Sequence, residues 1–170
     1  MKRRIDPLTI STEMSQTLTK GVFLTTKNGD KVNSMVIGWG HIGRIWERPV
    51  FVAYVRDCRY TREMLDAHPE FTVNVPINGA EKRAIAVCGG KSGRDIDKIK
   101  EAGLTLVEPE VVSVPAIKEY PLTLECKVIY RQEEDAKRLP EIIQKRFYSI
   151  ETENHIAYYG EIVAAYMIEE

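Results

Sequence analysis

Two arginines and a threonine stand close together where an apolar stretch of the sequence ends. Val55 closes a run of alternating apolar residues, and Arg56, Arg59 and Thr61 follow just as a helical pattern begins. The start of a helix favours an anion, because its first backbone N–H groups are free and its dipole is positive there. Guanidinium groups bind phosphate oxygens in pairs, and the Thr61 hydroxyl lies where a capping residue belongs. This cluster therefore favours a phosphate site.

The arginines also have a simpler alternative, which is to pair with nearby acids on a solvated surface. The acids within reach in the sequence are Asp57, Glu63 and Asp66. For a single arginine this alternative is the more common arrangement. The phosphate site is supported by the cluster as a whole, in which a strand end, two arginines, a hydroxyl and a helix start fall within six residues.

Composition indicates a globular chain whose overall charge attracts no polyanion. The 170 residues match the usual size of one domain, and we expect a single domain over 1–170. The 24 basic and 25 acidic residues give a formal net charge of −1, so we expect neither nucleic acid nor an anionic membrane as a partner. The sequence has no apolar run of ~20 residues and no signal-peptide pattern, which favours a cytoplasmic protein.

The cysteines and histidines are scattered and form no metal-binding pattern. Three cysteines, Cys58, Cys88 and Cys126, lie far apart in the sequence, and the three histidines have no second ligand at helical metal spacing. We therefore expect reduced thiols, no disulfide framework and no metal site.

The pattern of apolar residues and turn signals predicts a mainly antiparallel β protein with short helices. Strands are expected over 21–43, 50–55, 70–76, 122–134 and 155–170, with short extended pieces over 104–117. Helices are expected over 60–68, 80–87 and 94–103, the last closing on Gly103, and a charged connection with a helical turn over 135–154. Most connections are too short for parallel crossovers, so we expect an antiparallel barrel.

The first of these stretches is expected to be a hairpin that turns at Asn28-Gly29. Its second arm alternates without a clearly polar face and is expected to run to Gly43, covered on both sides. Pro49 is expected to end this passage before the next strand begins.

Two glycine-containing motifs match nucleotide-binding signatures only in part. Residues 38–43 have the spacing G-x-G-x-x-G, but Pro49 follows soon after and leaves no room for the helix that a dinucleotide site needs. The stretch 90–92 reads Gly-Lys-Ser, but Ile85 stands where a Walker A loop needs its first glycine. Residues 38–43 are better interpreted as a strand whose glycines allow a flat group to approach the backbone, and residues 90–92 as a flexible corner after a helix.

Five blocks in the same order along the chain carry a more specific signal. They are GVFLTTKNGDKVNSMVIGWGHIG (21–43), Arg56-x-x-Arg59-x-Thr61, FTVNVP (71–76), CGGKSGRDIDK (88–98) and HIAYYGEIVAA (155–165). Together, from about residue 15 to the end, the chain resembles the flavin reductase-like family and most closely its flavoredoxin-like branch. This resemblance implies an antiparallel Greek-key split β-barrel, the FMN-binding split barrel, with FMN at the interface of a homodimer.

Carried over residue by residue, the resemblance implies a set of cofactor contacts. Along the isoalloxazine ring and ribityl chain it places Asn33, Ser34, Met35, Val36, Ile37, Gly38 and Trp39. Around the phosphate it places Arg56, Cys58, Arg59 and Thr61, with Ser92 and Lys98 near the cofactor. The residues themselves agree, because a strand that is apolar on both faces and relieved by glycine can offer backbone groups to a flat ring.

Three of these positions have alternatives. Many family members have Pro or Ser where this chain has Cys58, and a thiol is a poorer donor to phosphate, so Cys58 could instead be a small buried side chain. A tryptophan such as Trp39 is more often part of a core than a cofactor partner. His155 could contact a nicotinamide as the catalytic residue, or could be a structural residue at a strand start.

The expected function is that of an FMN-dependent NAD(P)H oxidoreductase. NADH or NADPH would give a hydride to FMN, and the electrons would pass to free flavin, a ferric complex or a partner protein. One alternative is an FMN-bound electron carrier that does not use NAD(P)H. Another is a barrel that binds something else, such as heme, or that only dimerises.

Overall fold

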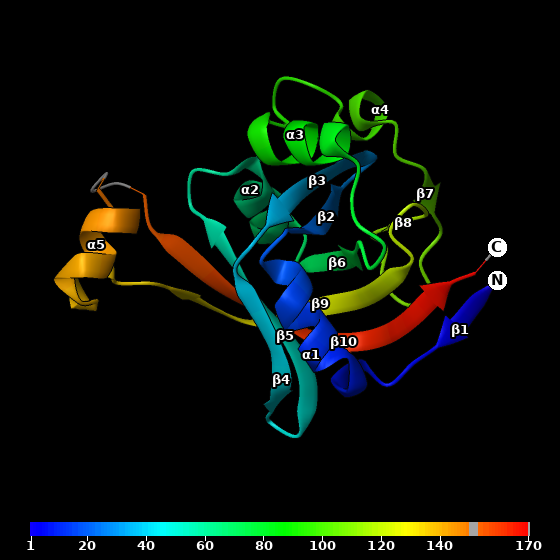
Figure 1. Ribbon diagram of the computed structural model, residues 1–170, viewed down its shortest axis with the longest axis horizontal. Helices are drawn as coiled ribbons and strands as arrows, with labels where there is room; N and C mark the ends of the chain where they lie inside the picture. Colours follow the sequence, from blue (N-terminus) through cyan, green and yellow to red (C-terminus); the bar gives the residue numbers. More distant parts are fainter. Residues whose placement is uncertain (150–152, 170) are drawn as a thin grey trace.

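The computed structural model of the protein describes residues 1–149 and 153–169, and it is dominated by one antiparallel sheet (Figure 1). Its strands are β1 (Lys2–Arg4), β2 (Val22–Asn28), β3 (Lys31–Ile37), β4 (Gly40–Ile45), β5 (Arg48–Arg56), β6 (Glu70–Val75), β9 (Leu122–Glu133) and β10 (His155–Ile168). They follow the order β3-β2-β6-β9-β10-β5-β4, and β1 pairs with β10. Two short strands, β7 (Leu106–Val107) and β8 (Ala116–Ile117), form a second sheet.

The helices are short and lie around the sheet. They are the α-helices α1 (Ser11–Leu18), α2 (Tyr60–Ala67), α3 (Lys82–Gly90), α4 (Lys98–Ala102) and α5 (Glu141–Phe147), and the 3-10 helices η1 (Pro7–Ile10) and η2 (Ala136–Arg138). None of the described helices has the length and apolar character that crossing a bilayer requires. The expected fold class, mainly β with short helices in a split barrel, is confirmed.

The barrel is split between β3 and β4, which are the two ends of the main hydrogen-bonded path. The predicted long second arm, running unbroken to Gly43, is therefore wrong: β3 ends at Ile37 and the chain crosses to pair with β5. Gly40 allows this crossing, because a Cβ there would stand 2.8 Å from the Val52 carbonyl oxygen. The break leaves residues 38 and 39 between two strands, and the Trp39 carbonyl oxygen accepts from the Tyr54 N–H of β5 at 3.4 Å.

Two hairpin turns differ in detail from the sequence-based expectation. The β2–β3 turn consists of Gly29 and Asp30, one residue later than predicted, and Gly29 has a φ of +58°. The β4–β5 turn was not predicted, and its residues Trp46 and Glu47 have φ values of +51° and +59°. Pro49 lies inside β5 and does not end the passage, because it falls beyond the part of β5 that pairs with β10.

The core fills the inside of the barrel and is capped by helices. Leu24, Phe51, Phe71 and Leu124 are fully buried at its centre. Helix α2 is confirmed close to its predicted bounds, whereas the helix predicted over 94–103 is reduced to α4, with Gly103 as its left-handed cap. Helix α1 was not predicted.

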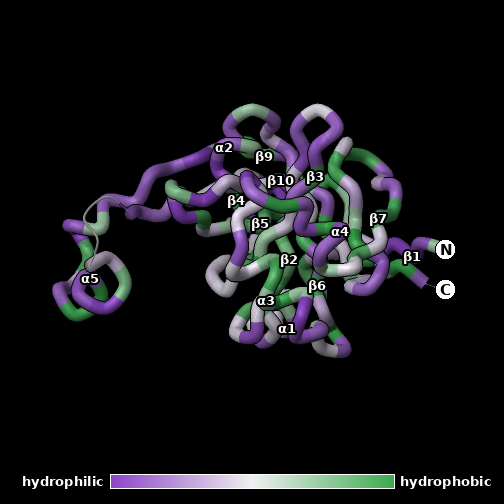
Figure 2. The backbone as a smooth tube through the Cα atoms, turned by 90° about the horizontal axis from the view of Figure 1, so that it is seen from above, coloured by the Kyte–Doolittle hydropathy of each residue, from purple (hydrophilic) through white to green (hydrophobic). Residues whose placement is uncertain are grey.

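One part of the chain projects from the barrel as an arm, which we define as residues 130–149 and 153–156 (Figure 1). It comprises the end of β9, η2, α5 and the start of β10. Figure 2 shows hydrophobic residues along the inner strands of the barrel and hydrophilic residues along the two strands that lead out to α5. Apart from Ile156, which is buried in the barrel core, the arm therefore contributes little to that core.

Candidate functional site

A cavity of about 210 Å³ lies beside the start of α2, and we call it the first cavity. Its walls come from β3, the beginning of α2, the end of α3, the loop 91–97 and α4. It is lined by Asn33, Met35, Cys58, Arg59, Tyr60, Thr61, Cys88, Gly89, Lys91, Ser92, Gly93, Arg94 and Lys98. Seven of the predicted cofactor contacts therefore lie around this cavity, although they are spread over 66 positions of the sequence. They are Asn33, Met35, Cys58, Arg59, Thr61, Ser92 and Lys98.

Four cationic side chains line the first cavity. Lys91 and Arg94 pair with Glu101 and Glu63, which leaves Lys98 and Arg59 as the two that suit an anion. Lys98 is only 5% exposed, and its Nζ donates to the Cys88 carbonyl oxygen at 2.9 Å. Burial lowers the pKa of Lys98, and the charge of Arg59 lowers it further. The Arg59 guanidinium makes no hydrogen bond or ion pair with a side chain of the described residues. Arg59 is exposed, so an anion between the two groups would pair with both charges and relieve the cost of burying that of Lys98.

The same cavity contains a buried acceptor without a donor. Asn33 donates through Nδ2 to the Thr61 hydroxyl oxygen at 3.1 Å, but its Oδ1 has no hydrogen-bond partner among the described residues. Gly93 packs so closely that a Cβ there would lie 2.0 Å from Oδ1. An unsatisfied buried carbonyl costs about 1–3 kcal/mol. A ligand hydroxyl would remove that cost, whereas an ionised phosphate oxygen has no proton to donate.

The role predicted for Thr61 as a helix cap is wrong. The residue before α2 is Arg59, with extended backbone (φ −74°, ψ 141°), and no side chain caps the helix. Thr61 instead lies in the first turn, buried, and accepts from Asn33. The first N–H groups of α2 therefore have no side-chain acceptor, and a ligand anion could occupy that place.

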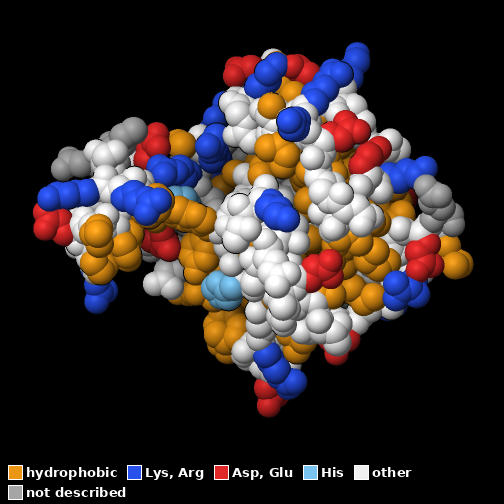
Figure 3. All heavy atoms as spheres, in the orientation of Figure 1, with side chains coloured by type: hydrophobic (Ala, Val, Ile, Leu, Met, Phe, Trp, Pro, Cys, Tyr) orange, Lys and Arg blue, Asp and Glu red, His pale blue; other side chains and the backbone are white. Residues whose placement is uncertain are grey.

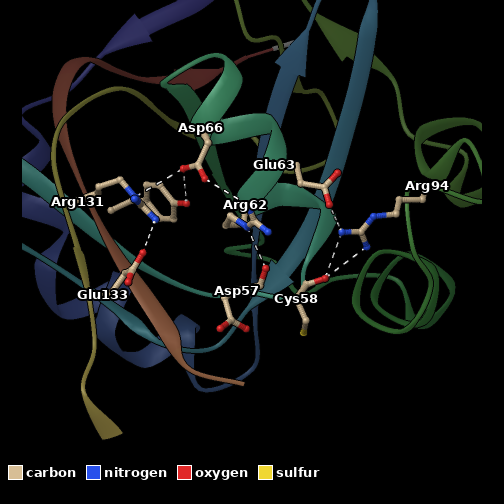
Figure 4. Close-up of polar contacts among 9 residues, drawn as sticks. Asp57, Cys58, Arg62, Glu63, Asp66, Arg94, Arg131 and Glu133 are labelled. Atoms are coloured by element: carbon tan, nitrogen blue, oxygen red, sulfur yellow. Dashed lines mark hydrogen bonds and ion pairs between the residues drawn. The ribbon is translucent and has the colours of Figure 1, made fainter. Parts of the chain in front are cut away.

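Arg94 ties the loop 91–97 to the start of α2, as Figure 4 shows. Its guanidinium donates to the Cys58 carbonyl oxygen at 3.3 and 3.4 Å and pairs with the Glu63 carboxylate. Cys58 is exposed, so the alternative of a small buried side chain is wrong. In the structure Cys58 contributes its backbone to this contact, and Ser92 accepts from the backbone N–H of Arg94 at 3.2 Å.

A second cavity of about 190 Å³ adjoins the first. It is lined by Met35, Val36, Ile37, Gly38, Trp39, Tyr54, Arg56, Arg59 and His155. Met35 and Arg59 line both cavities, so one elongated ligand could occupy the two together. Ser34 lines neither, because its hydroxyl is buried and accepts from Thr25 at 3.1 Å.

The structure separates the two arginines that the sequence placed together. Arg59 lies between the cavities, whereas Arg56 lines only the second. Arg56 pairs with Glu153 at 3.1 Å and donates to the Phe147 carbonyl oxygen at 3.0 Å. Neither arginine pairs with Asp57, Glu63 or Asp66 among the described residues, and Glu63 and Asp66 pair with Arg94 and Arg62 instead (Figure 4). Arg56 does pair with an acid, but with the distant Glu153.

Aromatic groups and a histidine form the outer side of the second cavity. Trp39 is 40% exposed and is not a core residue; its ring lies 4.7 Å from the His155 ring and 5.1 Å from the Phe147 ring, between centroids. His155 is 6% exposed, and its Nδ1 is 2.9 Å from the Tyr148 hydroxyl. Burial, reinforced by the charge of Arg56, lowers the pKa of His155 to about 4. The imidazole is therefore neutral at pH 7.

Comparison with known proteins agrees with the fold. The sequence model of the flavin reductase like domain matches residues 14–170. The chain belongs to the flavin reductase-like family. An uncharacterised protein of Archaeoglobus fulgidus is 28% identical over 141 residues, which cover 83% of this chain and 68% of that protein.

Two solved structures of the family are flavoredoxins. The flavoredoxin of Methanosarcina acetivorans has a TM-score of 0.68 and 28% identity, covering 88% of this chain and 68% of that one. The flavoredoxin of Desulfovibrio vulgaris has a TM-score of 0.69 and 25% identity, covering 88% of this chain and 69% of that one. In both comparisons the shared region spans about two thirds of the flavoredoxin chain.

Several residues in or next to the two cavities were missed by sequence reasoning. Four residues that were not predicted contact site residues: Tyr60, Gly93, Arg94 and Tyr148. Of these four, only Tyr148 lies outside the five sequence blocks that resemble the family. Gly93 and Arg94 belong to the stretch 88–98, which resembles the family, but within it only Ser92 and Lys98 were predicted to be cofactor contacts. For Tyr148 the sequence gave no signal, because it lies in a charged connection.

Proposed function

We propose that this member of the flavin reductase-like family binds FMN across the two adjoining cavities. The observation that carries the proposal is the combination of cations and an unpartnered buried acceptor in the first cavity. FMN has a dianionic phosphate, a polyhydroxylated chain and a flat ring, and each part would find matching groups in the cavities. The similarity to two flavoredoxins supports the same ligand class.

The residues that would hold FMN divide between the cavities. Arg59 and Lys98 would bind the phosphate, together with the free N–H groups at the start of α2. Asn33 Oδ1 would accept from a hydroxyl of the ribityl chain. The backbone at the end of β3 and through Trp39 would lie along the ring, with His155 beside it.

The activity we propose is an FMN-dependent oxidoreductase that uses NADH or NADPH. When bound, FMN supplies the redox chemistry, taking a hydride from the nicotinamide and passing electrons to free flavin, a ferric complex or a partner protein. The chain would contribute binding and orientation. The neutral His155 would act as a contact for the second ligand and not as a source of protons at pH 7, because its pKa is about 4.

Anaerobic mixing of the purified chain with FMN and a nicotinamide tests both steps. FMN should bind tightly enough to remain after desalting, and NADH or NADPH should bleach its absorbance within seconds. A chain that leaves FMN fluorescence unquenched would refute the binding proposal.

A second candidate is an FMN-bound electron carrier, favoured by the 28% and 25% identity to flavoredoxins. In this case bound FMN would be reduced by dithionite or by a reduced partner protein, and NADH and NADPH would leave it oxidised. The same mixing experiment therefore separates the two candidates.

We also propose that the protein forms a homodimer through an exposed aromatic cluster, defined as Trp46, Tyr130 and Tyr159. Trp46 is 52% and Tyr130 45% exposed, and the rings lie 5.2–6.0 Å apart between centroids. Figure 3 shows hydrophobic side chains along the hollow between the arm and the body of the barrel. Exposed apolar patches of this kind are typical of protein interfaces.

Sedimentation of two variants tests the dimer. Trp46→Ser should shift the protein toward monomer, whereas Leu106→Ser, which removes an exposed apolar side chain from β7, should leave the mass unchanged. A wild-type chain that sediments as a monomer at micromolar concentration would contradict the proposal.

A further inference from the structure

A chain of hydrogen bonds connects the arm to the second cavity. The Tyr148 hydroxyl donates to Glu134 Oε2 at 2.9 Å and lies 2.9 Å from His155 Nδ1. Glu134 follows β9, Tyr148 follows α5, and His155 is the first residue of β10. The backbone N–H of Glu134 also donates to the His155 carbonyl oxygen at 2.9 Å. Three segments of the arm are thus joined at the imidazole.

The direction of these bonds determines which imidazole nitrogen carries the proton. A tyrosine hydroxyl has one proton, and here it is donated to a carboxylate oxygen, which in its ionised form can only accept. The Tyr148 oxygen can therefore only accept from His155, so Nδ1 must carry a proton. In a neutral imidazole, Nε2 then has a free lone pair.

Burial, reinforced by nearby positive charges, keeps the imidazole of His155 neutral. Burial lowers its pKa to about 4, helped by Arg56 and Arg59, while Asp57 acts in the opposite direction. The remaining neighbours, Trp39 and Tyr148, are uncharged at neutral pH, and burial and Glu134 raise the pKa of Tyr148 to about 12. Nε2 has no hydrogen-bond partner among the described residues, and the ring lines the second cavity.

We propose that Tyr148 and Glu134 are positioning residues that hold His155 in the Nδ1–H form, so that Nε2 accepts an amide N–H from a ligand in the second cavity. The inference rests on the proposed function only for the identity of that ligand. Two groups of the expected ligands have this chemistry, the ring imide N–H of the flavin and the carboxamide N–H of the nicotinamide. A ligand that offers only acceptors to Nε2 would be disfavoured.

Nitrogen NMR of the unliganded chain tests the positioning directly. The chain has three histidines, so His155→Gln assigns the resonances. In the wild type at pH 7, Nδ1 should be protonated and Nε2 unprotonated. Tyr148→Phe should release the ring and give a large population of the Nε2–H form. Glu134→Gln should give a mixture of the two His155 tautomers. A glutamine amide can also donate to the Tyr148 oxygen, and Tyr148 could then donate to Nδ1 of His155.

A matched control is available on β10 itself. Tyr158 also donates its hydroxyl to a carboxylate, that of Asp66 at 3.0 Å, but does not line the second cavity. Tyr158→Phe should leave the His155 resonances unchanged. A wild-type Nε2 that is protonated, or a Tyr148→Phe variant with the wild-type His155 spectrum, would overturn the proposal. Neither result depends on FMN binding, so failure of the proposed function is detected separately.

Ligand titrations identify which N–H is accepted. If it is the nicotinamide carboxamide, Tyr148→Phe should raise the KM for NADH or NADPH about tenfold, the scale of one hydrogen bond, with kcat and FMN affinity within about twofold. If it is the flavin, the Kd values of FMN and riboflavin should rise by about the same factor. Binding constants that are all unchanged, with the tautomer altered, would overturn the assignment of Nε2 as a ligand contact.

Discussion

The two cavities differ in what supports them. The first cavity is enclosed by the barrel and its helices, and its polar groups contact one another within that body, as Asn33 does with Thr61. In the second cavity the key side chains are held by the arm: Arg56 by Glu153 and Phe147, and His155 by Tyr148. Affinity for a phosphate can therefore change independently of the environment of the ring.

The largest expected effect comes from replacing the two arginines separately. Arg59→Ala should weaken FMN binding by about 2–5 kcal/mol, because the phosphate would lose the charge pair that bound FMN would form with Arg59. Arg56→Ala should cost less than about 1 kcal/mol, since its guanidinium is already bound by Glu153 and Phe147. Fluorescence quenching measures both.

Riboflavin serves as the control for that pair of variants, because it lacks the phosphate. Its affinity should change little in Arg59→Ala. Equal losses for Arg56→Ala and Arg59→Ala would remove the distinction between the two cavities.

The second cavity should also make the protein sensitive to acid. Burial, followed by the charge of Arg56, lowers the pKa of His155 from 6.5 to about 4, so the unfolded chain binds this proton more readily. The free energy of unfolding therefore has its full value above pH 6.5, where His155 is neutral in both states. It falls as the pH drops toward 4, because the unfolded chain takes up the proton first. The loss amounts to roughly 3 kcal/mol if the whole difference is realised.

Urea unfolding at a series of pH values checks this. His155→Gln should reduce the dependence of the unfolding free energy on pH between 6.5 and 4. A variant as acid-sensitive as the wild type would place the responsible group elsewhere.

A smaller effect is expected from filling the first cavity. In Gly93→Ala the new methyl group would stand 2.0 Å from Asn33 Oδ1 and 3.0 Å from the Tyr60 ring, so the site must shift at a cost of about 1–3 kcal/mol. FMN affinity should fall as well. Gly90→Ala is the matched control, because nothing lies within 4 Å of its Cβ position. If Gly93→Ala binds FMN normally, Asn33 does not contact the ligand.

The smallest effect is expected at the position where this chain departs from the family pattern. Cys58→Ser should change FMN affinity by no more than about 0.5 kcal/mol, because the residue is exposed and contributes its carbonyl oxygen to Arg94. Isothermal titration would detect a larger loss, which would indicate direct contact by the thiol.

Local patterns predicted most of the barrel, and the site only in part. The strands and α2 were found because alternation and helical spacing are properties of neighbouring residues. The break after β3 was missed because it depends on the contact between Gly40 and Val52, which are joined only by sheet pairing. The separation of Arg56 from Arg59 likewise depends on Glu153, which lies about a hundred positions away. The sequence alone does not show such long-range pairing.

The β4–β5 turn has a consequence for engineering the protein. Trp46 and Glu47 both adopt left-handed backbone conformations, which cost ordinary residues about 1–2 kcal/mol each. An Asn-Gly pair would fit this turn without that strain and should give a chain that melts at a higher temperature. The same replacement would remove an indole from the surface on which two copies are proposed to meet. Greater heat resistance of the monomer would thus be gained at the expense of self-association.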